Sequence, residues 1–265
     1  MKRKYRSLQF VISILCLLIF PLGRLQSEEI KEKRSLKSGL SFEYFSRTIN
    51  WDENKYTSKL KSYSLILNTE MEILGGFSFN LLLGYSSSQY AEMTFRKLPI
   101  SLELDVGGIG GFLLGGEIKR KIIDIGYFEI SAEGRFVTYL GGKKEWEIPE
   151  LNVKGVATGK PRWTEASVGP SFVYNGLIDF TPYLSLKINK LWGTFDLDEK
   201  IEKLSGREEK DIQGEGLFAF SLGTIYKFRD DFHLQGEASV FLPYKNGIDF
   251  ELSIKAIYTF GSSRR

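Results

Sequence analysis

A two-residue alternation of apolar and polar side chains runs through most of this chain. Near residue 260, the segment FELSIKAIYTF places an apolar residue at every second position from Phe250 to Phe260, with mostly polar residues between. Successive side chains of a β-strand point to opposite faces, so this period predicts a strand whose two faces meet different surroundings. The apolar face then meets either a protein core or lipid.

The same alternation recurs in nine further segments. The apolar faces of the ten predicted strands span Leu40–Tyr44, Tyr63–Ile73, Phe77–Tyr85, Leu98–Ile122, Phe128–Phe136, Ala166–Tyr174, Phe180–Ile188, Phe218–Phe228, Phe232–Tyr244 and Phe250–Phe260. Gly107–Gly116, with glycines on both faces, either allows a bend within its strand or forms a hairpin tip.

The connections between these segments alternate in length. Short turns are predicted at 75–76, 123–126, 175–179 and 229–231, and longer polar loops at 51–58, 86–97, 141–162 and 196–214. This order is typical of up-and-down barrels with short periplasmic turns and long outer loops. The sequence therefore predicts an all-β fold, a closed antiparallel transmembrane β-barrel over 36–260, most simply of ten strands within a range of eight to twelve.

Residues 1–27 have the pattern of a secretory signal peptide. A basic head precedes an apolar run from Leu8 to Phe20, which is short for a transmembrane helix. Residues 28–35 are predicted to be a flexible arm, and 261–265 a short tail. Removing residues 1–27, which carry five basic and no acidic residues, changes the formal net charge from +3 to −2. The positive net charge of the whole sequence comes from this segment and therefore gives no argument for a nucleic-acid partner.

Aromatic residues gather at both ends of the apolar faces. The predicted periplasmic ends carry Phe77, Phe128, Tyr174, Phe180, Tyr226, Phe228, Phe232, Tyr258 and Phe260, and the other ends carry Tyr44, Tyr63, Tyr85, Trp192, Phe218, Tyr244 and Phe250. Two aromatic girdles separated by aliphatic residues are typical of side chains at the two interfaces of a membrane. We therefore expect lipid outside the barrel and a polar lumen, and a soluble lipocalin-like carrier is the weaker interpretation.

Charged side chains line the predicted lumen face. They are Glu70, Glu72, Glu117, Lys119, Glu129, Glu133, Arg135, Lys187, Glu237, Glu251 and Lys255. Buried charges are usually paired, so a network of ion pairs that fills the barrel is the first interpretation. A narrow water-filled path with a mild cation preference is the second.

These features resemble the small bacterial outer-membrane barrel families of the OmpA-barrel, OmpX and OmpW type. The resemblance rests on the signal peptide, the meander and the last strand, which ends in Tyr258-Thr259-Phe260. It implies a monomer in contact with outer-membrane lipid and lipopolysaccharide, whose last strand is recognised by the outer-membrane assembly machinery. Such families commonly end on the aromatic residue, whereas five residues follow Phe260 here.

Few residues offer catalytic chemistry. His233, the single histidine, is predicted at the periplasmic mouth beside Asp230 and Asp231, and a lone histidine is a weak metal signal. Glu103 and Asp105 resemble the acidic pair near the outer rim of the ten-stranded omptin proteases. Those enzymes also need a histidine at that rim, and outer-membrane phospholipases and lipid A deacylases need a serine and a histidine.

The sequence therefore favours a non-enzymatic barrel without a cofactor or metal. It acts either as a narrow porin-like channel or as a plugged barrel that presents the loops at 141–162 and 196–214. An omptin-like protease or a lipid hydrolase is the alternative, and it would require Glu103 or Asp105 to contribute.

Overall fold

The computed structural model describes residues 36–51, 56–73, 76–95, 102–147, 155–242 and 247–260. All of them belong to one compact unit that starts at Ser35. The predicted signal peptide, the flexible arm at 28–35 and the tail at 261–265 lie outside the described residues and remain predictions. Across the described ranges, no helix is long and apolar enough to cross a membrane.

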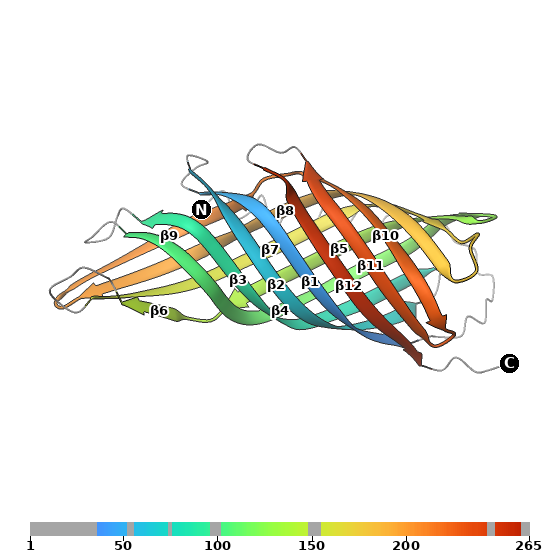
Figure 1. Ribbon diagram of the computed structural model, residues 1–265, viewed down its shortest axis with the longest axis horizontal. Coiled ribbons are helices and arrows are strands. Elements are labelled where there is room, and N and C mark those ends of the chain that lie inside the picture. The colour runs from blue at the N-terminus through green and yellow to red at the C-terminus, as the bar shows by residue number, and fades with distance from the viewer. Residues whose placement is uncertain are drawn as a thin grey trace. The chain divides into compact units, whose positions relative to one another are not determined.

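The described residues form twelve antiparallel strands (Figure 1). In chain order they are β1 (Leu36–Trp51), β2 (Tyr56–Ile73), β3 (Phe77–Phe95), β4 (Leu102–Ile125), β5 (Phe128–Gly141), β6 (Lys144–Glu147), β7 (Gly155–Tyr174), β8 (Phe180–Ile201), β9 (Leu204–Gly214), β10 (Phe218–Arg229), β11 (Phe232–Leu242) and β12 (Asp249–Phe260).

Ten of these strands close into a ring. The order is β1-β2-β3-β4-β5-β7-β8-β10-β11-β12, and the pairing of β12 with β1 completes it, with Leu36 opposite Phe260. Closure pairs every wall strand on both sides, which a strand in lipid requires because no water is present to bond its backbone. The predicted closed ten-stranded barrel is confirmed.

The ring presents an apolar outer surface. Each of its ten strands contributes at least one exposed large apolar side chain, for example Leu40, Leu65, Leu83, Leu114, Phe136, Phe172, Leu186, Leu222, Leu234 and Leu252. A continuous apolar belt around a closed barrel is the surface that meets the hydrocarbon of a bilayer. The interpretation as a soluble carrier is therefore wrong, since it would turn these side chains into the lumen.

The long polar loops predicted at 86–97, 141–162 and 196–214 are largely strand, so this part of the prediction is wrong. β8 continues from Ile188, its last pairing with β10, to Ile201, and then forms a hairpin with β9. β9 also pairs with β1 at Asn50, and β6 pairs with β7. Together, β6, β9 and three strand ends form what we call the outer extension. The three strand ends are residues 86–95, 155–163 and 193–201. The β8–β9 hairpin, which is part of this extension, is the orange pair of strands at the left of Figure 1.

β4 carries the glycine-rich segment within a strand, so Gly107–Gly116 is not a hairpin tip. A Cβ at Gly111 would collide with the Leu140 carbonyl oxygen of β5, which explains the need for glycine there. The apolar face predicted from Leu98 to Ile122 requires every second residue to point to the same side of the strand, and this regular alternation is interrupted in the glycine-rich segment. Val106 and Ile109 both point inward, because the pairing of β3 with β4 shifts register beyond Ser88.

Candidate functional site

Aromatic side chains fill the outer half of the lumen. Phe45 of β1 packs edge-on against Trp163 of β7 with their ring centroids 5.2 Å apart, and Trp163 stacks on Tyr139 of β5 at 5.4 Å. β1 and β7 are five strands apart in either direction around the ring, so they face each other across its full width. These three residues, here called the aromatic plug, therefore cross the lumen from wall to wall.

Hydrogen bonds fix the aromatic plug to the wall. The Tyr139 hydroxyl donates to the Ile109 carbonyl at 2.5 Å, and the Trp163 indole donates to Ser88 Oγ at 3.0 Å. Further buried apolar side chains surround the plug: Ile66, Leu82, Leu113, Val137 and Leu191. The two-residue alternation predicted a polar lumen and so did not indicate this layer, although these apolar residues lie at the lumen-facing positions of their strands.

The apolar core continues into the outer extension. Phe195 of β8 contacts Tyr90 of β3 edge-on at 5.2 Å and Phe95 at 5.7 Å. Burial raises the pKa of Tyr90 well above its ordinary value. The extension is thus packed on the same apolar core that fills the outer lumen, and these buried residues hold its outer surface in place.

Arg135 of β5 is the centre of a second layer that crosses the lumen nearer the short turns. Its guanidinium lies 2.5 Å from Glu43 of β1, 3.4 Å from Glu117 of β4 and 3.1 Å from Glu251 of β12. β5 and β12 also face each other across the ring. We call these four residues the ion layer.

The remaining predicted lumen charges lie on the side of this layer toward the short turns. Lys187 lies 3.5 Å from Glu133 and 3.8 Å from Glu237, and Lys119 bridges Glu133 and Glu129 at 3.5 and 3.8 Å. Lys37 pairs with Glu70 and Glu72 at 3.3 and 2.8 Å, and Lys255 acts on Glu117 electrostatically. Ten of the eleven predicted charges thus lie in ion pairs, and the pairs of Lys37 with Glu70 and Glu72 form a group of their own. Lys37 and Glu43, which the prediction missed, are at the lumen parity of β1.

Arg47 of β1 is fully buried at the rim beneath the outer extension. Its guanidinium donates to Asn189 Oδ1 at 3.0 Å and to the Glu215 carbonyl at 2.7 Å, and it lies 3.6 Å above the Phe241 ring. It also lies 3.8 Å from Glu165 on the opposite wall. One side chain thus ties β1 to β7, β8, β11 and the β9–β10 connection.

The aromatic residues predicted at the periplasmic membrane interface lie at the end of the barrel that carries the short turns. Ring pairs form between Phe128 and Tyr174, Phe180 and Tyr226, Phe228 and Phe232, and Tyr258 and Phe260, with centroids 4.8 to 6.2 Å apart, and Phe77 lies under the Arg120 guanidinium. At the other end, Tyr44 contacts Tyr63 at 4.6 Å and Phe250 at 5.6 Å. Tyr244 lies outside the described residues.

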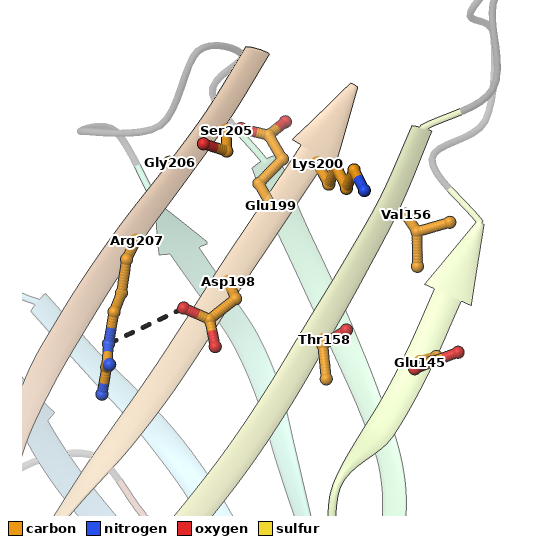
Figure 2. Close-up of a pocket in the computed structure, with 9 residues that line it drawn as sticks. All are labelled: Glu145, Val156, Thr158, Asp198, Glu199, Lys200, Ser205, Gly206 and Arg207. Carbon is orange, nitrogen blue, oxygen red and sulfur yellow. Dashed lines mark ion pairs between the residues drawn. The ribbon is translucent and has the colours of Figure 1, made fainter. Parts of the chain in front are cut away.

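A groove of about 620 Å³ opens on the outer extension (Figure 2). It is lined by Glu145, Val156, Thr158, Asp198, Glu199, Lys200, Ser205, Gly206 and Arg207, which come from β6, β7, β8 and β9. Arg207 lies 3.7 Å from Asp198, the ion pair drawn in Figure 2, and 3.7 Å from Asp196. Three carboxylates and two cations nearly balance, so the groove offers hydrogen bonds without a strong charge.

The catalytic candidates are dispersed. His233 pairs in register with Lys227 and Ile257 beside the β10–β11 turn, at the end of the barrel away from the groove. The side chains of Glu103 and Asp105 lie outside the described residues. Among the described residues, no group of three or more His, Cys, Asp or Glu side chains is arranged to hold a metal ion.

Comparisons with known proteins give the class of the barrel. No protein-family model matches the chain, and no curated protein matches it. The chain is similar in structure to the outer membrane protease OmpT from Escherichia coli, with 10% identity over 89% of this chain and 99% of that chain and a TM-score of 0.50. A major outer membrane protein from Thermus thermophilus covers 86% of this chain and 100% of its own at 9% identity and a TM-score of 0.40. The translocator domain of the autotransporter NalP from Neisseria meningitidis covers 97% of both chains at 11% identity and a TM-score of 0.35. The apolar belt, the closed ring and the likeness to OmpT confirm the predicted resemblance, and the chain folds as an outer-membrane β-barrel.

Proposed function

We propose that this protein is a closed, non-conducting and non-enzymatic outer-membrane barrel that carries a rigid binding surface on its outer extension. The observation that carries the proposal is the contact between Phe45 and Trp163, which joins opposite walls of the ring through the middle of the lumen. The contact of Arg135 with Glu251 joins opposite walls a second time.

The two crossings differ in chemistry, and each opposes ion flow in its own way. A constriction of aromatic side chains excludes water and so removes the hydration that an ion needs. In the ion layer, Arg135 is held by carboxylates of three strands, so these charges are engaged with one another rather than with a permeating ion. This arrangement favours the plugged barrel over the narrow channel.

The groove of Figure 2 is the surface we propose for binding. Its walls offer hydroxyl, carboxylate, ammonium and guanidinium groups in near balance. Such a lining suits an uncharged ligand rich in hydroxyl groups, of the saccharide class. His233, the single histidine of the chain, lies at the other end of the barrel, which speaks against histidine-dependent hydrolysis at this groove.

We also propose that the barrel is a monomer that contacts outer-membrane lipid, including lipopolysaccharide, through its belt. β12 pairs with both β11 and β1 and exposes Tyr258 and Phe260. These features support the expectation that this strand is recognised by the assembly machinery.

A liposome swelling assay tests the closed lumen. Proteoliposomes that contain the barrel, placed in an isotonic arabinose solution, are expected to swell no faster than protein-free liposomes. Swelling at a rate proportional to the amount of barrel would contradict the proposal and favour the channel.

The groove has its own test. An oligosaccharide array is probed with the wild-type barrel and with Arg207→Ala, which disrupts the groove, beside Lys61→Ala on the exposed outer face of β2 as the control. Binding by the wild type and the control that is lost in Arg207→Ala supports the saccharide proposal. Equal signals from all three proteins would overturn it.

A further inference from the structure

Two of the short turns carry an exposed apolar patch. Ile125 and Tyr127 of the β4–β5 turn are 69% and 64% exposed, and Leu177 and Ile178 of the β7–β8 turn are 51% and 95% exposed. We call these four residues the turn patch. Large apolar side chains in such turns lie fully in water unless something covers them, and each costs free energy there.

The two turns form one surface. The Asn175 backbone amide donates to the Tyr127 carbonyl at 2.7 Å, and the Tyr127 and Tyr174 rings meet edge-on at 6.3 Å. Gly126 supplies the positive φ of 60° that the tight β4–β5 turn needs. The patch is therefore held in place by the barrel wall.

The turn patch is continuous with the lipid-facing belt. Phe128 directly follows Tyr127, is 60% exposed and packs against Tyr174 at 5.1 Å, while Phe180 lies just beyond the β7–β8 turn. On β4, exposed apolar side chains extend from the belt through Ile122 and Ile123 to Ile125. The apolar wall is thus taller on the side of β4, β5, β7 and β8.

Another turn at the same end is charged. In the β10–β11 turn, Lys227 pairs with Asp230 at 2.7 Å and Arg229 with Asp231 at 3.2 Å. Near the turn patch, Lys121 and Asp124 pair with each other at 3.0 Å, and Asp179 is exposed. The contrast indicates that different parts of this end meet different surroundings.

We infer that the β4–β5 and β7–β8 turns insert into the inner leaflet of the outer membrane, so that the barrel is anchored more deeply on that side. The occupant of the patch is lipid, because the patch extends a surface that already faces lipid. Tyr127 is suited to the headgroup region, where amphipathic rings are enriched. A taller wall on one side is accommodated by tilt of the barrel or by local adjustment of the bilayer.

Fluorescence quenching at two turns tests this inference. The full chain carrying Cys16→Ser, which removes its single native cysteine, receives Ile178→Cys or, as the matched control, Asp230→Cys. Each is labelled with an environment-sensitive dye and reconstituted in phosphatidylcholine bilayers. We expect the dye at position 178 to be quenched several-fold more by lipids with a shallow nitroxide than the dye at 230, and several-fold less by aqueous iodide.

Equal iodide quenching at the two positions would overturn the inference and point to a periplasmic protein as the cover of the patch. A gel mobility shift on heating checks that each labelled barrel is folded. If Ile178→Cys does not fold, Leu177→Cys provides the same comparison on the same turn.

Discussion

At the scale of single residues, Arg47 is a fully buried cation that contacts four separate parts of the chain. It is in contact with Asn189, the Glu215 carbonyl, the Phe241 ring and Glu165, each from a different part of the chain. A charge taken out of water is tolerated only when such partners replace its hydration. Arg47 therefore ties β1 to three other wall strands, β7, β8 and β11, and to the connection that directly follows β9.

Arg47→Met should lower the free energy of unfolding by about 3–5 kcal/mol, since it leaves buried polar partners without a donor. Urea unfolding of the barrel in lipid vesicles, followed by tryptophan fluorescence, measures the change. Arg207→Met is the control, because that side chain is 64% exposed and its loss should change stability by at most about 0.5 kcal/mol. A similar effect of both substitutions would refute the role given to Arg47.

At the scale of strands, glycine marks where two strands approach most closely. A Cβ at Gly169 of β7 would collide with the Leu186 carbonyl oxygen of β8, whereas a Cβ at Gly236 of β11 would meet no atom within 4 Å. Both residues lie within strands of the same ring. Comparing the same substitution at the two positions therefore separates the effect of close strand approach on stability from the general cost of having glycine in a strand.

Gly169→Ala should destabilise the barrel by about 1–3 kcal/mol, because the backbone of β8 has to move away. Gly236→Ala should be neutral or slightly stabilising, since it only restricts the unfolded chain. Parallel urea unfolding curves of the two variants decide the matter. Equal stability of the two would show that the approach of β7 to β8 is not tight.

The strands also show what the sequence could and could not predict. Where one face meets lipid, as in FELSIKAIYTF, the alternation is strong and the predicted strand is confirmed. β9 has no such contrast between its faces, because its inward face carries two charged residues, Glu208 and Lys210. These residues are buried as an ion pair, with Lys210 Nζ 2.7 Å from Glu208 Oε1. Its charged sequence therefore resembles a loop, although its backbone pairs with β8 along almost its whole length.

At the scale of the whole molecule, the ring of ten strands follows from the number of alternating segments and the alternation of connection lengths. The filling of the lumen does not follow from them. Trp163 and Tyr139 have the parity of the lumen, but their contact with Phe45 depends on which strands face each other across the ring. That relation is fixed by closure between β1 and β12, which local periodicity does not contain.

The central claim is that the lumen is closed, and single-channel recording in a planar bilayer tests it most directly. The wild-type barrel should insert without discrete current steps at neutral pH and moderate salt. The combined variant Phe45→Ala, Trp163→Ala and Arg135→Ala removes side chains from both crossings and should give steps, which shows that silence of the wild type is not a failure of insertion. Discrete steps from the wild type, with a cation preference that disappears when Glu117 and Glu133 are changed to Gln, would contradict the account and make the lumen the functional site.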